Sequence, residues 1–507
     1  MLAGVRRPTA TLCLVLLAAD VSGCHRVTKQ SPDIVAASGK GIAPNEHMSG
    51  VTLNDGTEYK FDKSPAAFVR GDTIHANVGK QPLGFALSNV QRVWVESLDK
   101  GRTSLMVLGV TVGVLGTLVA IAIASKESCP FVYSWDGTQY VFDGEPYGGA
   151  ITRGLERDDY SNLEQLRPDE AGNYRLMVTN EVNETQYTNS MELMVIDHQP
   201  GARIAMDEFG KPYVVSDARG PSVARDQDNR DLTAWLATDD QRIWEPLPVV
   251  NPTTGPRQEI VLEYPKPRGA TRARLVARAG TGIWGSHMIR EMLQLRGSSV
   301  TEWYASLDNS PANLAALRAW NVNEELYVLK LDVDEDGVWS TRGLLPGGGP
   351  FLTETRVVPL DVSRVNGDKL RLRIRPPSGF WALNSFEISY DDATPPLTVT
   401  RVAPMSAVTS DNRDVLADLT AADQRYYAMP VTGDRALLTF AAPPARPGTE
   451  RSVFLHTRGY YRLHLPESGP ANEAALARIV SEHDGAARLA AESFAKRRVA
   501  GVPTGGN

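Results

Sequence analysis

The sequence predicts a mainly β protein. It has two tandem antiparallel modules of the β-sandwich or jelly-roll type, a small N-terminal β module, one transmembrane helix and short helical connectors. Short strands with alternating apolar and polar residues recur between clusters of Gly, Pro, Asn and Asp. A series of motifs occurs twice in the same order, which is typical of an internal repeat. One uncharged apolar run has the length of a membrane span.

Composition limits the functional classes. A chain of 507 residues is long enough for about two to four domains. The net charge of −7 and the pI of about 5.7 give no basic footprint, so nucleic-acid binding is disfavoured. Cys13 would leave with the leader and Cys24 would be lipidated, so Cys129 stays alone and an intramolecular disulfide is excluded from the mature chain.

The chain begins with a leader of the signal-peptide type, residues 1–23. Two arginines make its start positive, and an apolar stretch follows at 11–19. Val-Ser-Gly-Cys at 21–24 resembles the lipobox of bacterial lipoproteins, and Asp20 departs from the usual pattern. The resemblance implies cleavage before Cys24 and acylation of that residue, by palmitate or a similar chain. The alternative is a signal peptide that is cleaved in the ordinary way or not at all.

Residues 24–103 are predicted to form the small β module, attached to the membrane by the lipid on Cys24. Asn-Asp-Gly at 54–56 is a hairpin-turn signal between two short alternating segments. No catalytic cluster is present. The module is therefore expected to be a compact spacer or a partner-binding unit.

The run 104–124 contains no charged residue and, as a helix, is long enough to cross roughly 30 Å of hydrocarbon. It predicts a transmembrane helix, and a buried core helix is the alternative. Basic residues are more frequent before the run than after it, which places the preceding segment in the cytoplasm. A lipid on Cys24 places the same segment outside. The sequence thus leaves the side of 126–507 open, with a preference for the periplasm or another extracytoplasmic space.

The first large module is expected over 126–285. Two aromatic strands flank a Trp-Asp-Gly-Thr turn within 129–143. The start Cys-Pro-Phe-Val-Tyr-Ser-Trp-Asp-Gly, the Gly-Gly pair at 148–149 and Asn-Glu-Val-Asn-Glu-Thr at 180–185 resemble motifs of uncharacterised bacterial secreted and lipid-anchored proteins. The resemblance implies an envelope β protein and brings no activity with it.

The second large module is expected over 326–468, as a repeat of the first. Asp-Asn-Arg-Asp occurs at 228–231 and at 411–414, and Asp-Gln-Arg follows each at the same distance. Recurrence in both copies predicts a structural role for these residues, with Arg bridging loops. Further matches are 174–178 with 370–374, 189–193 with 384–388, 282–284 with 459–461, and the Gly-rich loops at 148–149 and 347–349.

Helices are expected between and after the two copies. The connector 286–325 has apolar residues at helical spacing, and Ser310-Pro311 is a helix start with a cap and Pro at the first position. The Ala-rich end, 469–507, predicts a helix that packs on the last module, followed by a disordered tail.

Two sets of residues are candidates for ligand binding. Asp332, Asp334 and Asp336 have the spacing of the first half of a calcium loop, but Gly343 occupies the position of the bidentate Glu, so an acidic turn is the default. No other cofactor is indicated. Aromatic residues could stack on a sugar or contact a protein partner, with core packing as the competing explanation: Trp235, Trp244, Trp284, Trp381, Tyr426, Tyr427, Tyr460 and Tyr461.

No motif of a serine hydrolase, a zinc protease or a phosphate-binding loop occurs in the sequence. The expected function is that of a non-enzymatic, membrane-anchored envelope lipoprotein whose tandem β modules bind a protein partner or have structural roles. The alternative is an envelope protein that binds or processes carbohydrate. A membrane is an expected partner in both cases.

Overall fold

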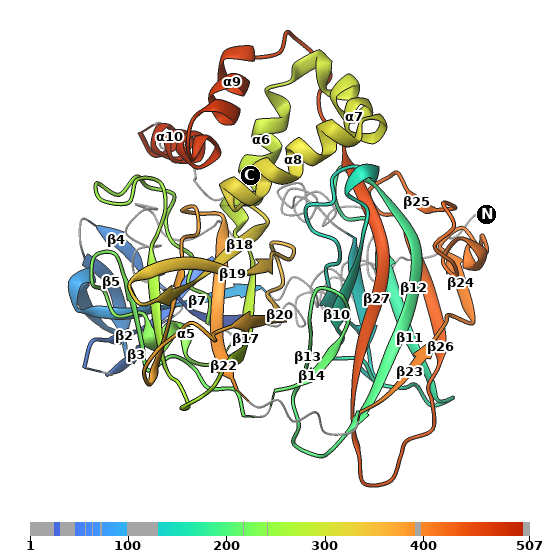
Figure 1. Cartoon of the computed structure of the whole chain (residues 1–507), viewed down its shortest axis with the longest axis horizontal. Coiled ribbons are helices and arrows are strands. Elements are labelled where there is room, and N and C mark those ends of the chain that lie inside the picture. The colour runs from blue at the N-terminus through green and yellow to red at the C-terminus, as the bar shows by residue number, and fades with distance from the viewer. Residues whose placement is uncertain are drawn as a thin grey trace, which may run out of the picture.

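A computed structural model describes residues 25–30, 46–98 without 56, 63, 71 and 72, 130–390 without 216 and 241, and 397–499. The predicted signal peptide, Cys24, the apolar run 104–124 and the last residues of the tail lie outside these ranges. Within them, no helix combines the length and the apolar character needed to cross a bilayer. The fold class is mainly β, as predicted, with antiparallel sheets throughout apart from one parallel contact (Figure 1).

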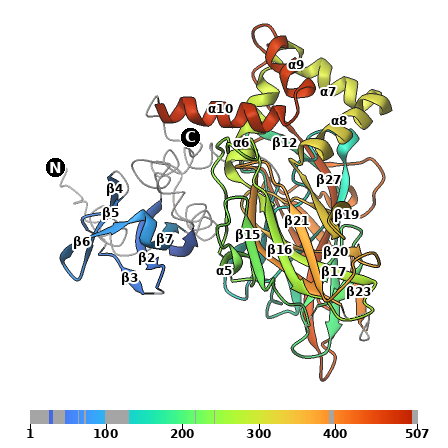
Figure 2. The same cartoon turned by 60° about the vertical axis from the view of Figure 1, so that its left-hand side comes forward.

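The N-terminal strands form two small sheets, with orders β1-β7-β2-β3 and β4-β5-β6, and lie beside the larger body (Figure 2). The predicted hairpin is present, because β2 and β3 pair around the turn and the Thr57 amide donates to Asp55 Oδ1 at 2.9 Å. The apolar core between the two sheets includes Val51 and Ile74. The strands are β1 His25–Gln30, β2 Glu46–Leu53, β3 Glu58–Lys60, β4 Phe68–Arg70, β5 Thr73–Val78, β6 Gln81–Ala86 and β7 Val90–Leu98, with the short helix η1 Leu87–Asn89.

Two further pairs of sheets make up the larger body. The first sheet pair consists of β10-β27-β12-β23, with β25 on β12, and of β24-β26-β11-β8-β9. One apolar core takes side chains from both of its sheets, among them Leu176, Leu193 and Leu438. Its strands are β8 Phe131–Trp135, β9 Tyr140–Gly144, β10 Arg157–Asn162, β11 Asn173–Thr179, β12 Glu184–His198, β23 Thr398–Val402, β24 Ser406–Thr409, β25 Tyr427–Met429, β26 Arg435–Ala441 and β27 Glu450–Leu463.

The second sheet pair consists of β14-β13-β20-β17-β22 and of β15-β16-β21-β18-β19. Its core includes Leu262, Leu275 and Leu372. Its strands are β13 Ile204–Met206, β14 Pro212–Val214, β15 Val223–Asp226, β16 Ile260–Pro265, β17 Arg272–Thr281, β18 Val328–Glu335, β19 Val338–Pro346, β20 Glu354–Asp361, β21 Lys369–Ile374 and β22 Trp381–Ser389.

The two repeat copies exchange strands. The first copy gives β8–β12 to the first sheet pair and β13–β17 to the second, whereas the second copy gives β18–β22 to the second pair and β23–β27 to the first. The prediction of self-contained modules at 126–285 and 326–468 is corrected accordingly. Each sheet pair thus combines one half of the first copy with the complementary half of the second, an arrangement similar to domain swapping within one chain.

The repeat itself is visible in the strand pairings. The order β24-β26-β11-β8-β9 corresponds strand by strand to β15-β16-β21-β18-β19, and the irregularities in β12 and β22 fall at the matched residues Asn189 and Asn384. The strand pairings shift one predicted match, that of 282–284 with 459–461. Gly459 lies opposite Thr188, and the equivalent position of the second sheet pair is Ala279, three residues before Gly282.

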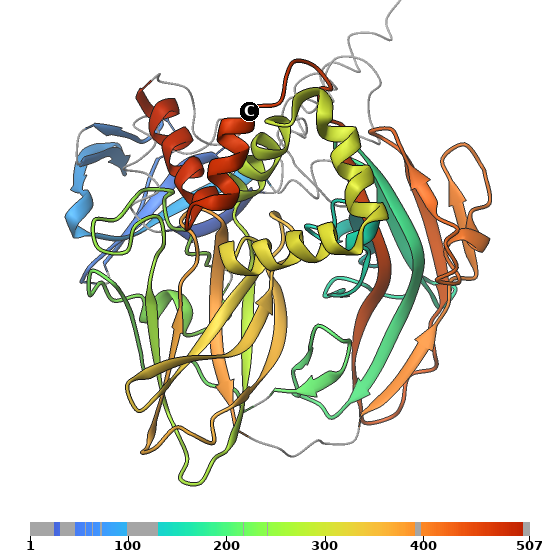
Figure 3. The same cartoon turned by 45° about the horizontal axis from the view of Figure 1, so that its top comes forward.

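Helices cover one end of both sheet pairs (Figure 3). Ser310 caps α8 as predicted, since its hydroxyl accepts from the Asn313 amide at 3.3 Å and Pro311 is the first residue. The helices are η2 Arg153–Leu155, α5 Thr233–Leu236, α6 Ile283–Gln294, η3 Gly297–Ser299, α7 Val300–Asn309, α8 Pro311–Glu324, η4 Leu416–Asp418, α9 Glu473–Ser481 and α10 Gly485–Val499.

Arg257 connects this helical layer to the second sheet pair. Its side chain is 4% exposed and pairs with Glu325 at 2.8 Å and Asp484 at 2.6 Å. The remaining donors bond to the carbonyls of Arg375, Asn323 and Glu324, so all five N–H groups have partners. One arginine therefore joins α8, the α9–α10 junction and the end of β21.

Candidate functional site

The aromatic residues singled out in the sequence belong mostly to the cores. Trp235, Trp244, Trp284, Trp381, Tyr427, Tyr460 and Tyr461 are each less than 9% exposed, and Tyr426 is half-buried. Trp381 Nε1 donates to the Glu325 carbonyl at 2.7 Å, and the Tyr461 hydroxyl accepts from the Gly149 amide at 3.1 Å. Of these eight residues only Tyr426 is partly exposed, and its ring contacts that of the buried Tyr460.

The three aspartates of the calcium-like motif lie on β18 and its turn, where each has a different partner. Asp332 accepts from Arg373 at 2.9 Å, Asp334 from Arg371 at 2.6 Å, and Asp336 from Asn366 at 2.6 Å. The described part of the chain contains no group of three or more His, Cys, Asp or Glu placed to hold a metal ion. The first two aspartates thus form ion pairs with arginines of the neighbouring strand β21, and the third accepts from an uncharged amide.

The two Gly-rich loops pack against each other where the sheet pairs meet. A Cβ at Gly148 would lie 2.9 Å from the backbone of Gly348, and one at Gly349 would lie 2.1 Å from the carboxyl carbon of Glu145. Glu145 Oε2 accepts from the amides of Phe351 and Leu352. These glycines serve close backbone packing.

A buried charge cluster lies next to these loops. Arg356 on β20 donates to Asp159 on β10 at 2.6 Å and also to Glu354, and the Ser161 hydroxyl donates to Glu354 at 2.8 Å. Burial raises the pKa of the Glu354 carboxyl to about 7, although the charge of Arg356 acts in the opposite direction. The cluster links β10 to β20, and therefore one sheet pair to the other.

Three tyrosines form a cluster on β12, β27 and the loop before β25, where they pack against the apolar core of the second sheet pair. The rings of Tyr187 and Tyr460 stack at 4.6 Å with an angle of 13°. Tyr426 meets both rings edge-on, at 6.1 and 5.5 Å. Burial raises the pKa values of Tyr426 and Tyr460, so both hydroxyls stay protonated at neutral pH.

A pocket of about 640 Å³ adjoins this tyrosine cluster, between η2, α7 and the end of β27. Asp308 accepts from Thr152 Oγ1, from the Gly154 amide at 3.1 Å and from Arg462 Nη2 at 2.8 Å. The lining residues are Arg153, Gly154, Thr301, Ala305, Asp308, Asn309 and Arg462. We call this the arginine pocket.

Arg153 lies on the rim of the arginine pocket and is exposed. Its Nη2 donates to the amide oxygen of Gln424 at 2.8 Å. Arg462 follows Tyr460 by two residues on β27, so both side chains project from the same face of the strand. The pocket and the tyrosine cluster are therefore neighbours on one surface.

Sequence reasoning missed Tyr187, Arg153, Asp308 and Arg462, which come from four separate parts of the chain. Register within the repeat would have drawn attention to the tyrosines. Tyr187 and Tyr460 lie opposite each other in the first sheet pair, where the second pair has Ala382 and Gly280. A side chain present in one copy and missing from the other is not required by the repeat.

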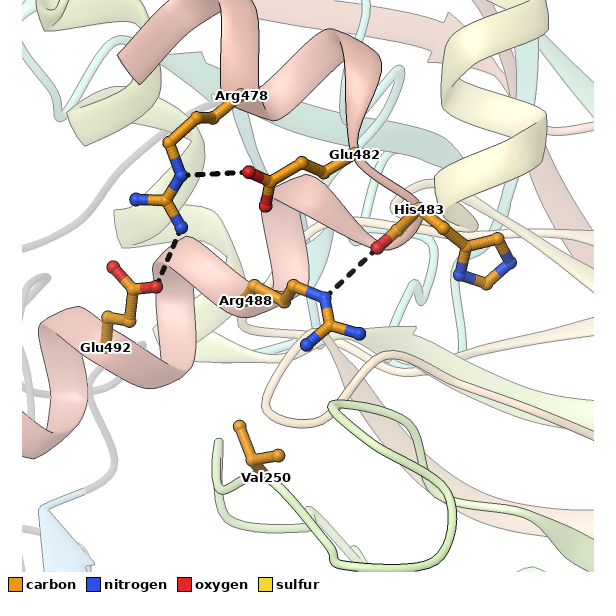
Figure 4. Close-up of a pocket in the computed structure, with 6 residues that line it drawn as sticks. All are labelled: Val250, Arg478, Glu482, His483, Arg488 and Glu492. Atoms are coloured by element: carbon orange, nitrogen blue, oxygen red, sulfur yellow. Dashed lines mark hydrogen bonds and ion pairs between the residues drawn. The ribbon is translucent and has the colours of Figure 1, made fainter. Parts of the chain in front are cut away.

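A second cavity, of about 430 Å³, lies between the helices α9 and α10 and the loop that carries Val250 (Figure 4). Arg478 bonds to Glu482 at 3.2 Å and to Glu492 at 2.9 Å, and Arg488 Nε donates to the His483 carbonyl. The charged groups of this cavity thus hold the two helices to each other.

Comparison with known proteins gives no assignment. No family model matches the chain, and no curated protein matches it. Among solved structures, the GH31 alpha-xylosidase from Xanthomonas citri matches with 10% sequence identity and a TM-score of 0.15, over 81% of this chain and 34% of the xylosidase chain. The chain therefore spans about a third of that protein's length, and a similarity at this TM-score carries no argument about fold or activity.

Proposed function

We propose that the chain is a non-enzymatic envelope protein of a bacterium, anchored to a membrane by a lipid on Cys24 and by the segment 104–124. Its paired sheets would serve as a rigid binding or structural unit. We also propose that residues 126–507 lie on the extracytoplasmic side of the membrane.

The main support for the proposal is that charged side chains of the repeated motifs and of the buried core are bonded to one another in ion pairs. A general acid or base needs a titratable group in a cleft, free to meet a substrate. The repeated Asp-Gln-Arg motifs instead brace their own turns, with Asp240–Arg242 at 2.9 Å and Asp423–Arg425 at 2.5 Å. The buried Arg257 has all of its donors bonded within the protein.

Contacts between the sheet pairs support a role as a rigid unit. Every sheet lies within one pair, but the buried Arg356 on β20 bonds to Asp159 on β10, and one apolar cluster contains Phe454 from the first pair and Met206 from the second. Relative motion of domains, which many enzymes use to close an active site, is restricted by this connection.

A carbohydrate-binding function is the second candidate, and the tyrosine cluster beside the arginine pocket favours it. Aromatic rings stack on the apolar faces of sugars, and guanidinium and carboxylate groups bond to their polar substituents.

Metabolic labelling with an alkyne fatty acid tests the anchor. We expect label in the full chain and none in Cys24→Ala, with Cys129→Ser labelled as the full chain is.

Alkaline phosphatase fused after Asn507 tests the side of the membrane and should be active. An inactive phosphatase together with an active cytoplasmic reporter at the same position would overturn the extracytoplasmic location.

A further inference from the structure

We infer that the arginine pocket, with the tyrosine cluster beside it, binds a sugar unit that carries a carboxylate, as part of an acidic glycan. This inference rests on the proposed function, because it assigns a ligand to a protein that binds without catalysing a reaction.

The charges around the pocket favour an anionic ligand. Asp308 is already satisfied by Thr152, Gly154 and Arg462, so its negative charge is neutralised within the protein. Arg153 is held by the uncharged Gln424, and no carboxylate of the described residues lies within ion-pair distance of it. The lining side chains Arg153, Asp308 and Arg462 therefore carry one net positive charge, in the planar form that suits a carboxylate, and the nearby Glu467 carboxylate accepts from the lining residue Thr301.

Arg318 adds a third guanidinium beside the pocket. It is exposed on α8, and its Nη2 donates to the carbonyl of Gly154, which lines the pocket. Its bond is to an uncharged group, like that of Arg153. Both cations remain available to a ligand.

The tyrosine cluster favours a sugar over a simple anion. Its two half-buried members, Tyr187 and Tyr426, lie beside Tyr460 on β27, and burial raises the pKa of Tyr426, so that its hydroxyl stays protonated. An aromatic surface next to a cationic pocket suits a ligand with an apolar ring face and an anionic substituent.

Comparison of the two sheet pairs argues that the tyrosine cluster does more than stabilise the repeated fold. The second sheet pair is built on the same pattern and has Ala382 and Gly280 in place of Tyr187 and Tyr460. Asp308 lies on α7, in the connector between the copies. The pocket is thus an addition to the repeat at one of two equivalent places.

Titration calorimetry of the full chain in detergent micelles tests the inference. The probes are tri-galacturonate and tri-glucuronate, their methyl esters, which keep the rings and remove the charge, and glutarate, which keeps carboxylates and lacks the ring. We expect at least one acidic trimer to bind, about 10-fold or more tighter than its ester and than glutarate. Arg153→Gln should weaken binding by about 10- to 100-fold and Tyr187→Leu by about 3- to 10-fold, while Arg413→Gln, at a distant exposed ion pair, should bind as the unaltered chain does.

The outcomes separate the inference from the proposed function. Equal binding of acid and ester overturns the anionic ligand, equal binding of glutarate overturns the sugar, and binding of neither trimer overturns the site. Each of these leaves the anchored, non-enzymatic protein in place. Shortening of a trimer during incubation would instead overturn the non-enzymatic function, whatever the affinity.

Discussion

Replacing Arg257 by Met should separate the helical layer from the second sheet pair. The substitution removes the cation between Glu325 and Asp484, whose side chains are 7% and 5% exposed. Both carboxylates would stay buried, with Lys330 at 3.8 Å from Glu325 and His483 at 2.9 Å from Asp484 as the remaining cations nearby.

The expected loss of stability follows from that burial. Breaking a buried ion pair by removal of one partner costs about 3–5 kcal/mol, because a charge is left without compensation. Lys330 and His483 reduce the cost, so we expect about 3 kcal/mol for Arg257→Met. The exposed pair Arg413–Asp411, with both side chains 65% exposed, provides a matched control, and Arg413→Met should cost less than about 0.5 kcal/mol.

Urea unfolding of the full chain in detergent, followed by tryptophan fluorescence, measures the difference. Trp381 reports on the region directly, since its indole bonds to the Glu325 carbonyl. The triple variant Arg257→Met, Glu325→Gln and Asp484→Asn should regain most of the lost stability, because no charge is then left unpaired. Equal stability of Arg257→Met and the Arg413→Met control would refute the reasoning, as would a triple variant no better than the single one.

Three further predictions follow from other parts of the structure. Burial raises the pKa of Asp143 to about 7, so the folded protein keeps a proton that the unfolded chain loses near pH 4. Stability should therefore fall as the pH rises from about 4 to 7, and Asp143→Asn should remove up to about 3 kcal/mol of the fall that urea titrations measure between pH 5 and pH 8. Gly349→Ala should lower the free energy of unfolding by about 1–3 kcal/mol, because the new methyl group meets the Glu145 carboxyl group. Gly84→Ala, whose new methyl group has its nearest neighbour at 3.3 Å, should cost less. Thermal unfolding compares the two variants, and equal losses of stability would contradict the packing argument. Residues 130–296 and 297–499 should be insoluble when produced separately and should purify as one complex when produced together, because each sheet pair needs strands from both halves. Independent folding of either half would contradict this prediction.

The sequence predicted the strands and their repeat well, because both depend on local patterns. β21 alternates as expected, with Leu370, Leu372 and Ile374 buried and the arginines between them more exposed. The matched Asp-Asn-Arg-Asp turns form equivalent bridges, Arg225 with Asp231 and Val408 with Asp414. The pattern could not predict which strands pair, because matched strands of the two copies have similar sequences and the pairing of distant segments is set by the tertiary fold.

Burial on two faces also escapes a pattern of alternation. The alternation of apolar and polar residues at 386–390, with Glu387 between Phe386 and Ile388, is typical of a half-buried strand, yet all nine residues of β22 are buried. Glu387 is compensated by Arg203 at 2.5 Å. The aromatic residues were ambiguous for the same reason, because composition does not show which face of a strand another element covers.

The candidate site was the least predictable part. Its residues come from η2, α7, β12, β27 and the loop before β25, and no spacing in the sequence connects them. Asp308 shows the difficulty, because it lies in the connector 286–325, for which the sequence predicts helices and no site residue. Spatial neighbours of this kind emerge from the tertiary fold alone.

The exchange of strands has a consequence for how the chain is made. β12 ends at residue 198 and its partner β23 begins at residue 398. The first sheet pair therefore cannot be completed until about 200 more residues have been synthesised, which takes roughly 10–40 s on the ribosome. During this interval β10, β12 and the edge of β11 opposite β8 have no partner and can pair with strands of other chains. Biogenesis is therefore expected to depend on a holding chaperone, in whichever compartment the chain folds, until its last strand, β27, has arrived.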